Sequence, residues 1–146
     1  MSLRLTVAGP QDAALFGRVA EDVFDNPIDP DLLRRYLASP TMHIVLALQD
    51  DLLVGFCSGL VHFHPDKPED FFINELGVAR AWRRQGIATA LIHATCDLAR
   101  GLGCRQAWVV AEPTDAAMGF YRSLKVPQTG TNLAMFTFDL AGDAGR

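Results

Sequence analysis

Residues 80–90 have the sequence RAWRRQGIATA. Two arginines, a glutamine and a glycine (83–86) stand between an apolar segment and a run with helical periodicity. The first turn of a helix leaves backbone N–H groups without partners, and the helix dipole adds partial positive charge there. Gly86 lets the backbone approach a ligand closely, and Arg83 and Arg84 add charge-assisted hydrogen bonds. The stretch therefore predicts a pyrophosphate site, with an ordinary solvated turn as the alternative.

Two common phosphate-binding motifs do not fit this stretch. No Lys-Ser or Lys-Thr pair follows Gly86, so the spacing is not that of a Walker A loop. Only one glycine is present, so it is not a dinucleotide-binding fingerprint either. An anion bound here would therefore be held by neither of these two motifs.

Outward from this stretch, apolar periodicity predicts alternating strands and helices. Strands are expected at residues 3–7, 43–49, 52–63, 71–78, 106–111 and 133–140. A first helix is expected after Asp12, with Leu15, Val19 and Val23 on one face. Three further helices are expected: one that begins at Asp29-Pro30, one from Ile87 that closes at Gly101 and Gly103, and one through Ala117–Leu124. This order predicts an α/β (α+β) fold, in which helices pack on a sheet within a single domain, 1–146.

Composition limits the classes of function. The chain has 146 residues, 49% of them hydrophobic and 21% charged, which is typical of one globular domain. A net charge of -4 argues against a nucleic-acid-binding role and is compatible with a cationic substrate. Three cysteines without a CxxC pair indicate reduced thiols, and no signal or membrane-spanning segment is evident. We therefore expect a soluble cytoplasmic protein that acts neither on nucleic acid nor at a membrane.

Arg83-x-x-Gly86-x-Ala88 resembles the Arg/Gln-x-x-Gly-x-Gly/Ala signature of the GCN5-related N-acetyltransferases. Residues 72–111 resemble the core motif of that family as a whole. Within the family, residues 74–92 (NELGVARAWRRQGIATALI) are most similar to the aminoglycoside 3-N-acetyltransferase type I branch. The resemblance implies a central mixed, mostly antiparallel sheet with helices on both faces. It also implies acetyl-CoA as co-substrate and a homodimer.

The resemblance assigns cofactor contacts residue by residue. The backbone of Leu76, Gly77 and Val78 would bind the pantetheine arm as an added strand does. The Leu76 amide would also polarise the thioester carbonyl. The pyrophosphate would lie against residues 83–89. Thr114 stands where the family usually has an asparagine that touches CoA. The implied contacts are Leu76, Gly77, Val78, Arg83, Arg84, Gln85, Gly86, Ile87, Ala88, Thr89 and Thr114.

Two residues are candidates for catalysis. Tyr121 matches the family's tyrosine that protonates the departing CoA thiolate, although its helical spacing also fits a core position. Glu75 stands where the family often places the group that deprotonates the amine, directly or through a water molecule. A charge at the edge of a strand is the alternative for Glu75.

Acidic and histidine side chains suggest where the acceptor binds. Asp22 and Asp25 lie in the region where this fold usually builds its acceptor pocket, and they would attract a cationic amine. His62 and His64 would share one side of a strand. No third metal ligand is evident beside them, although Asp66, Glu69 and Asp70 follow in the loop, so no metal is expected and the pair is placed at the substrate cleft. The substrate-binding candidates are Asp22, Asp25, His62, His64, Glu112 and Asp139.

The sequence thus predicts an acetyl-CoA-dependent N-acetyltransferase. Its acceptor would be a primary amine of a small cationic molecule, with an aminoglycoside as the named favourite and antibiotic resistance as a corresponding role. The amine would attack the thioester directly in a ternary complex. Two alternatives stay open: a protein or peptide N-acetyltransferase, which needs an open groove, and a CoA-binding regulatory module without catalysis.

Overall fold

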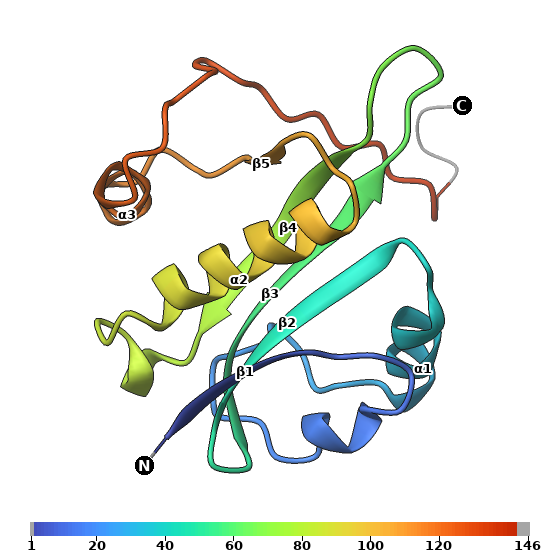
Figure 1. Cartoon of the computed structure of the whole chain (residues 1–146), viewed down its shortest axis with the longest axis vertical. Helices are drawn as coiled ribbons and strands as arrows, with labels where there is room; N and C mark the ends of the chain where they lie inside the picture. The colour runs from blue at the N-terminus through green and yellow to red at the C-terminus, as the bar shows by residue number, and fades with distance from the viewer. Residues whose placement is uncertain (1, 143–146) are drawn as a thin grey trace. The chain divides into compact units, whose positions relative to one another are not determined.

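The computed structural model describes residues 2–142, which fall into two compact units that divide between Ala111 and Glu112 (Figure 1). The first unit contains a five-stranded sheet in the order β1-β2-β3-β4-β5. The strands are β1 (Leu3–Val7), β2 (Met42–Gln49), β3 (Leu52–His62), β4 (Asp70–Val78) and β5 (Ala107–Val109). The first four pair antiparallel and β4 pairs with β5 in parallel, so the predicted mixed, mostly antiparallel sheet is confirmed.

Helical segments of the first unit lie between these strands. They are the 3-10 helix η1 (Ala13–Phe16), α1 (Pro30–Ala38), the 3-10 helix η2 (Arg80–Trp82) and α2 (Ile87–Gly101). In Figure 1, α2 crosses in front of β3 and β4, which it contacts. No helix among residues 2–142 is both long and apolar enough to span a lipid bilayer.

The sheet carries helices on both faces, as predicted. On one face, Leu46 of β2 and Phe56 of β3 pack with Leu37 of α1 and with η1. On the other face, a side chain added at Gly55 would meet Leu91 and Ile87 of α2. Because successive strand residues point to opposite faces, the continuous apolar run of β2 serves both cores.

Helix α1 begins and ends where the sequence predicts. The Asp29 carboxylate accepts hydrogen bonds from the N–H groups of Asp31 and Leu32, and Pro30 occupies the first turn. Ser39 is extended before Pro40, which disfavours the helical conformation in the residue that precedes it.

The helix predicted after Asp12 is wrong beyond one short turn. Only Ala13–Phe16 is helical, and the Asp12 carboxylate accepts from the N–H of Gly9 instead of capping the turn. Residues 18–20 bond to the start of β3: Leu53 N–H donates to the Arg18 carbonyl and Ala20 N–H donates to the Leu53 carbonyl, both at 2.9 Å. The apolar spacing therefore reflects an irregular loop that packs into the core, with Val23 buried, and not a helix.

The second unit contains α3 (Asp115–Ser123), which confirms the last predicted helix. Thr114 is its N-cap, and its hydroxyl accepts from the N–H of Ala117 at 3.2 Å. The strand predicted at 133–140 is wrong: these residues form no strand, and Met135, Phe136 and Phe138 are highly exposed. Alternation predicts a face, but a strand also needs a hydrogen-bonded neighbour. In the first unit, β5 is likewise shorter than the predicted 106–111.

Candidate functional site

The second half of β4 has a paired strand on one side only. β5 pairs with Phe71, Phe72 and Ile73, and no described strand pairs with residues 74–78 on that side. The Ala79 N–H donates to the Val54 carbonyl of β3 at 2.8 Å. Backbone groups of alternate residues point to opposite sides of a strand, so those of Leu76 and Val78 face away from β3. On its unpaired side the sheet thus offers the backbone of Leu76 and the N–H of Val78, two of the residues for which a cofactor contact is predicted.

The backbone groups of Gly77 point to the side opposite to those of Leu76 and Val78. Its backbone groups face β3, where its carbonyl oxygen lies 3.0 Å from the site of a Cβ added at Gly55. A Cβ on Gly77 itself would lie 2.8 Å from the Phe56 ring and 2.9 Å from the Val23 carbonyl oxygen. Glycine is required here because the loop through Val23 passes close against β4.

The turn before α2 combines two positive-φ residues with a helix start that no side chain caps. Gly86 and Arg84 both adopt positive φ, 79° and 63°, and a Cβ on Gly86 would meet nothing within 4 Å. No side chain caps α2 at its first turn, in which Ala90 N–H donates to the Gly86 carbonyl. Arg84 and Gln85 are exposed, while Ile87 is buried and fixes the helix on the sheet.

Arg83 links this turn to β4. Its Nε donates to the Val78 carbonyl oxygen at 3.1 Å, on the side of β4 that faces away from β3. The two predicted parts of the cofactor site, the β4 edge and the α2 turn, are therefore joined by a direct hydrogen bond.

Glu75 lies on the face of β4 that carries α1 and the loop through Val23. Glu75 is two residues before Gly77, so the two share one face of the strand, and the Glu75 side chain is exposed. Burial raises the pKa of Tyr36 on α1 to about 12 and outweighs the hydrogen bond from Ser58, which lowers it. The Glu75 carboxylate adds to the rise in the Tyr36 pKa. Ser58 is the direct partner of Glu75 across β3 and β4, next to a β-bulge.

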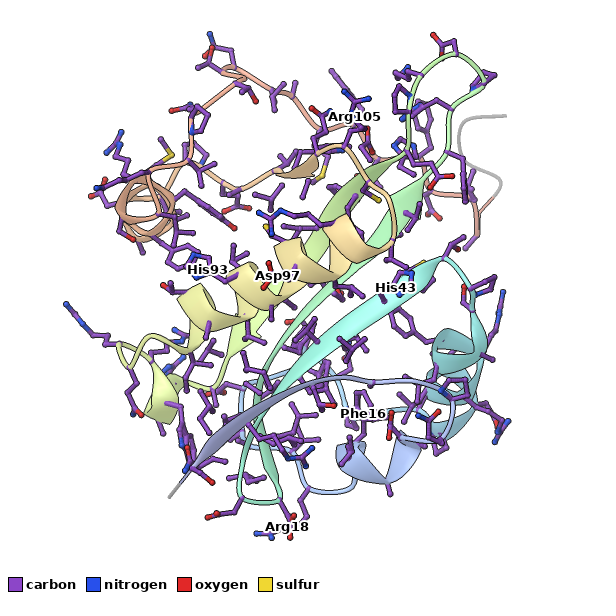
Figure 2. All side chains as sticks on the ribbon, in the orientation of Figure 1. Phe16, Arg18, His43, His93, Asp97 and Arg105 are labelled. Carbon is purple, nitrogen blue, oxygen red and sulfur yellow. The ribbon has the colours of Figure 1, made fainter. Side chains whose placement is uncertain are left out.

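Tyr36 and Ser58 were missed by the sequence analysis. The Tyr36 hydroxyl donates to the His43 carbonyl at 2.7 Å, and Figure 2 labels His43 on β2. Ser58 is buried although it is polar, in an otherwise apolar run. That polar interruption was the available signal, but only the register shows that it faces Glu75.

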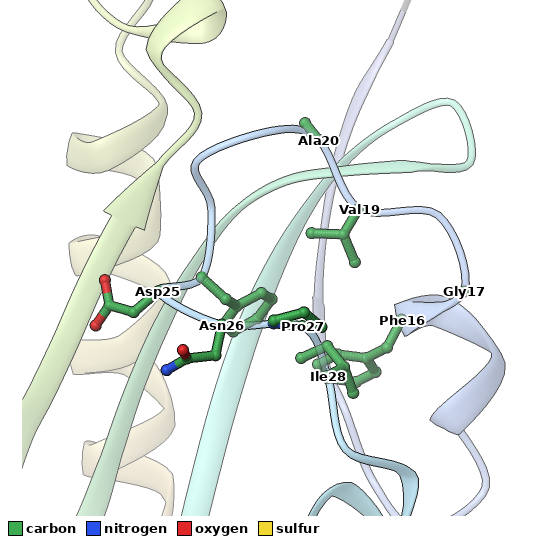
Figure 3. A pocket seen from close by; sticks show the side chains of 9 residues that line it. Phe16, Gly17, Val19, Ala20, Asp25, Asn26, Pro27 and Ile28 are labelled. Carbon is green, nitrogen blue, oxygen red and sulfur yellow. The ribbon is translucent and has the colours of Figure 1, made fainter.

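A pocket of about 470 Å³ lies in the loop that follows η1. Figure 3 shows its lining, in which Asp25 and Asn26 are the polar members. The carboxylate of Asp25 points away from Phe16 and Ile28 in this view. Asp22 is outside this lining and adopts positive φ, 71°. The lining residues are Phe16, Gly17, Val19, Ala20, Phe24, Asp25, Asn26, Pro27 and Ile28.

None of the three thiols has the environment of a reactive cysteine. Burial raises the pKa of Cys57 to about 11. Burial also raises the pKa of Cys96 and that of Cys104, the latter with help from nearby carboxylates. A thiol is nucleophilic as the thiolate, so these environments disfavour an acyl-cysteine.

A protein-family comparison matches residues 15–125 to the acetyltransferase (GNAT) family. The chain belongs to this family. Family membership assigns it N-acetyltransferase activity and confirms the resemblance that the α2 turn predicted. Comparison with functionally curated proteins finds no significant match.

Solved structures of aminoglycoside acetyltransferases are similar along nearly the whole chain. Enzyme meta-AAC0020, from an uncultured soil metagenomic sample and in complex with sisomicin, matches with a TM-score of 0.77 and 25% identity over 94% of this chain and 96% of its own. Enzyme HMB0005, from a similar sample, gives 0.74 and 26% over 94% and 100%. AAC(6')-Iy, in complex with a bisubstrate analogue, gives 0.75 at 16% identity over 95% and 100%, a likeness of fold alone.

Two of the predicted substrate contacts of this GNAT chain, His62 and His64, lie in the first unit but far from Glu75. His62 and His64 gather around Asp70, at the start of β4. Glu75 is five residues further along the strand, which corresponds to about 17 Å. Burial raises the pKa of Asp70, but hydrogen bonds from Trp108 and His64 and the charges of the two imidazoles outweigh it, and the net pKa is lowered. The structure therefore groups these histidines with one another and not with Glu75.

The remaining predicted residues belong to the second unit. Tyr121 lies on α3, partly exposed, with its ring 4.9 Å from that of Phe120. The Glu112 carbonyl accepts from the N–H of Thr114, and the Asp139 carboxylate accepts from the N–H of Ala141. Their roles in cofactor and acceptor binding stay predictions.

Proposed function

We propose that this GNAT enzyme transfers the acetyl group of acetyl-CoA to a primary amine of a small cationic acceptor. The observation that carries the proposal is the half-paired edge of β4. There, the backbone of Leu76 and the N–H of Val78 face away from β3 beside the α2 turn. Glu75 stands on the face of the same strand that carries the loop of residues 17–29, which we call the acceptor loop.

The residues of the β4 edge and the α2 turn fit the chemistry of this co-substrate. When bound, acetyl-CoA supplies a thioester whose carbonyl an uncharged amine can attack directly. The Leu76 N–H would donate to the carbonyl oxygen and stabilise developing negative charge. Val78 would hold the pantetheine arm, and residues 83–89 would bind the pyrophosphate through backbone N–H groups and the exposed Arg84. Gly77 supports the site by its small size, and Thr114 would add a contact from the second unit.

Glu75 would accept the proton of the acceptor ammonium, because only the neutral amine has a lone pair for attack. Asp25 at the pocket and Asp22 nearby in the loop would attract a cationic acceptor by charge. Tyr121 would protonate the departing thiolate. Glu112 and Asp139 stay candidate acceptor contacts from the second unit.

The favoured acceptor is an aminoglycoside. The support is the similarity to meta-AAC0020, whose structure contains sisomicin, together with the carboxylates of the acceptor loop. The homodimer, the cytoplasmic location and the role in antibiotic resistance stay predictions. Sedimentation of the purified chain and the drug sensitivity of cells that express it test the first and the last.

Release of free thiol from acetyl-CoA, measured across a panel of amines, tests the proposal. We expect aminoglycosides and polyamines to be acetylated faster than peptides with a free N-terminus or lysine. Asp25→Asn should raise the KM of a cationic acceptor more than it lowers kcat, while Asp51→Asn in the β2–β3 turn serves as the matched control. Faster acetylation of peptides would favour the protein-acetyltransferase alternative. Thiol release that no amine of the panel increases would contradict the proposal.

A further inference from the structure

The β3–β4 hairpin brings three metal-binding side chains together at its looped end. His62 is the last residue of β3, Asp70 is the first of β4, and the two are direct partners in the ladder. His64 follows two residues after His62 and turns back to the same carboxylate. The sequence analysis expected no metal because no third ligand was evident; the register supplies Asp70 as that ligand.

The distances fit a shared ion. Asp70 Oδ1 lies 3.4 Å from His62 Nδ1, and Asp70 Oδ2 lies 3.3 Å from His64 Nε2. The His64 contact is a long hydrogen bond, and the His62 contact is longer than the usual 2.7–3.2 Å. Donor atoms 2.0–2.2 Å from a tetrahedral zinc ion stand roughly 3.3–3.6 Å apart. One donor atom from each of the three residues lies within 4.8 Å of the others, so small side-chain rotations would close the site.

The surroundings hold the carboxylate in place. Asp70 is only 8% exposed, and Trp108 Nε1 of β5 donates to its Oδ1 at 3.2 Å. Trp108 in turn packs on Phe72, with ring centroids 4.5 Å apart. Such an outer hydrogen bond orients metal ligands in known sites. His64 is mostly buried, whereas the His62 side chain is 47% exposed, which leaves the site open to solvent on one side.

We propose that His62, His64 and Asp70 bind a divalent transition metal ion, with Zn²⁺ as the representative ion because two imidazoles and one carboxylate form known zinc sites. The ion joins the end of β3 to the start of β4 and closes the loop of residues 63–69. Because Glu75 lies about 17 Å further along β4, the ion stabilises the hairpin and takes no part in acetyl transfer.

Trp108 provides a readout of binding that does not depend on activity. In the full-length chain with Trp82→Phe, Trp108 is the remaining tryptophan. We expect Co²⁺ to quench its fluorescence saturably at one ion per chain, and Zn²⁺ to displace Co²⁺ and restore the signal. Zn²⁺ should also raise the melting temperature, because it binds the folded chain.

Variants locate the site. Asp70→Asn and His64→Gln should each weaken Zn²⁺ binding at least tenfold. Trp108→Phe should weaken metal binding ten- to a hundredfold, measured by the absorption of bound Co²⁺ because this variant lacks the fluorescent Trp108. Matched controls are His93→Gln on α2 (Figure 2) and Cys104→Ser, whose thiol lies near Asp70; neither should change the affinity. Circular dichroism checks that each variant is folded.

Two results would overturn the proposal. One is no saturable binding by the parent chain up to about 1 mM Zn²⁺, and the other is unchanged binding in a folded Asp70→Asn and His64→Gln double variant.

Discussion

Glu75 combines exposure to solvent with a fixed position on a central strand. Its β3 partner Ser58 is buried, and the Tyr36 hydroxyl on α1 senses its charge. Glu75→Gln keeps the shape and removes the basicity. We expect single-turnover acetyl transfer at neutral pH to fall about a hundredfold or more, with unchanged affinity for acetyl-CoA, if this carboxylate accepts the amine proton.

A purely electrostatic role of Glu75 predicts a different result. The acceptor would bind more weakly to Glu75→Gln, salt would reduce the advantage of the wild type, and the single-turnover rate at saturation would be unchanged. Glu69→Gln, in the loop before β4, is the matched control and should leave both quantities unchanged. If Glu75→Gln also leaves both unchanged, Glu75 is only a strand residue.

Tyr36 gives a prediction on stability and pH. Tyr36→Phe removes the hydrogen bond to the His43 carbonyl and should lower the free energy of unfolding by about 1–2 kcal/mol. The pKa of Tyr36 is about 12 in the folded chain against an ordinary value of 10.0, so the folded state keeps this proton while the unfolded chain releases it. The stability due to Tyr36 is therefore complete below pH 10 and is lost as the pH rises toward 12.

Urea unfolding of the wild type and Tyr36→Phe at several alkaline pH values checks this. The difference in unfolding free energy should be largest below pH 10 and should narrow above it. A difference that stays constant with pH would mean that the Tyr36 proton does not distinguish the folded from the unfolded chain.

Single residues differ in how far the sequence predicts their setting. Asp29 and Pro30 specify the start of α1 through local bonds, so their roles follow from adjacent residues alone. The neighbours of Glu75 and Asp70 do not follow in this way. Tyr36 is far from Glu75 in sequence, and the pairing of His62 with Asp70 depends on the register of the hairpin, which a bulge shifts.

At the scale of elements, the turn before α2 carries a prediction on cofactor binding. Gly86→Asp adds a negative charge where the pyrophosphate would lie, and it should weaken acetyl-CoA binding at least tenfold, or about 1.4 kcal/mol. A Cβ at Gly86 meets no neighbour, and Asp tolerates positive φ, so the fold should persist at a cost of about 1 kcal/mol. Isothermal titration measures the affinity.

Two variants separate charge from shape at this turn. Gly86→Asn has the same size as Gly86→Asp without the charge and should bind acetyl-CoA more tightly than the aspartate variant. Gly101→Asp adds the same charge at the far end of α2, where there is also open space, and should bind as the wild type does. Equal affinities for all four proteins would place the pyrophosphate elsewhere.

The elements show where pattern analysis succeeds and where it fails. α2 combines an apolar stripe with a glycine at its start, and both its type and its position were predicted. The loop through Val19 and Val23 has helical spacing, but its backbone hydrogen bonds go to Leu53 of β3. Residues 133–140 alternate as a strand does, yet no described strand pairs with them. Both errors arise because backbone partners are decided by tertiary structure.

At the scale of the whole molecule, the two faces of the sheet carry different elements. α2 covers one face, and its first turn adjoins the free edge of β4; α1 and the acceptor loop cover the other face, on which Glu75 lies. The apolar runs of β2 and β3 made a buried central sheet predictable. Which β4 residues point to which face depends on alternation along the strand, which the sequence encodes, and on a bulge, which the sequence does not reveal.

Tyr121 tests whether the second unit takes part in the chemistry of the first. Tyr121→Phe removes only the hydroxyl from a partly exposed ring on α3. If this hydroxyl protonates the departing thiolate, kcat should fall about a hundredfold, while the affinity for acetyl-CoA changes little. Phe120→Leu, at the adjacent position, is the control for the ring contact that the two residues share. It should alter stability more than turnover.

The combination of kinetics and unfolding decides between the roles of Tyr121. The CoA thiolate that departs from acetyl-CoA needs a proton, so loss of the proton donor should lower turnover most with acceptors for which the chemical step is rate-limiting. Unchanged kcat in Tyr121→Phe, with a loss of unfolding free energy of about 1 kcal/mol or more, would make the hydroxyl a structural hydrogen-bonding group. A large fall in kcat with unchanged stability would instead assign α3 to the active site, so that residues 112–142 serve catalysis together with the β4 edge.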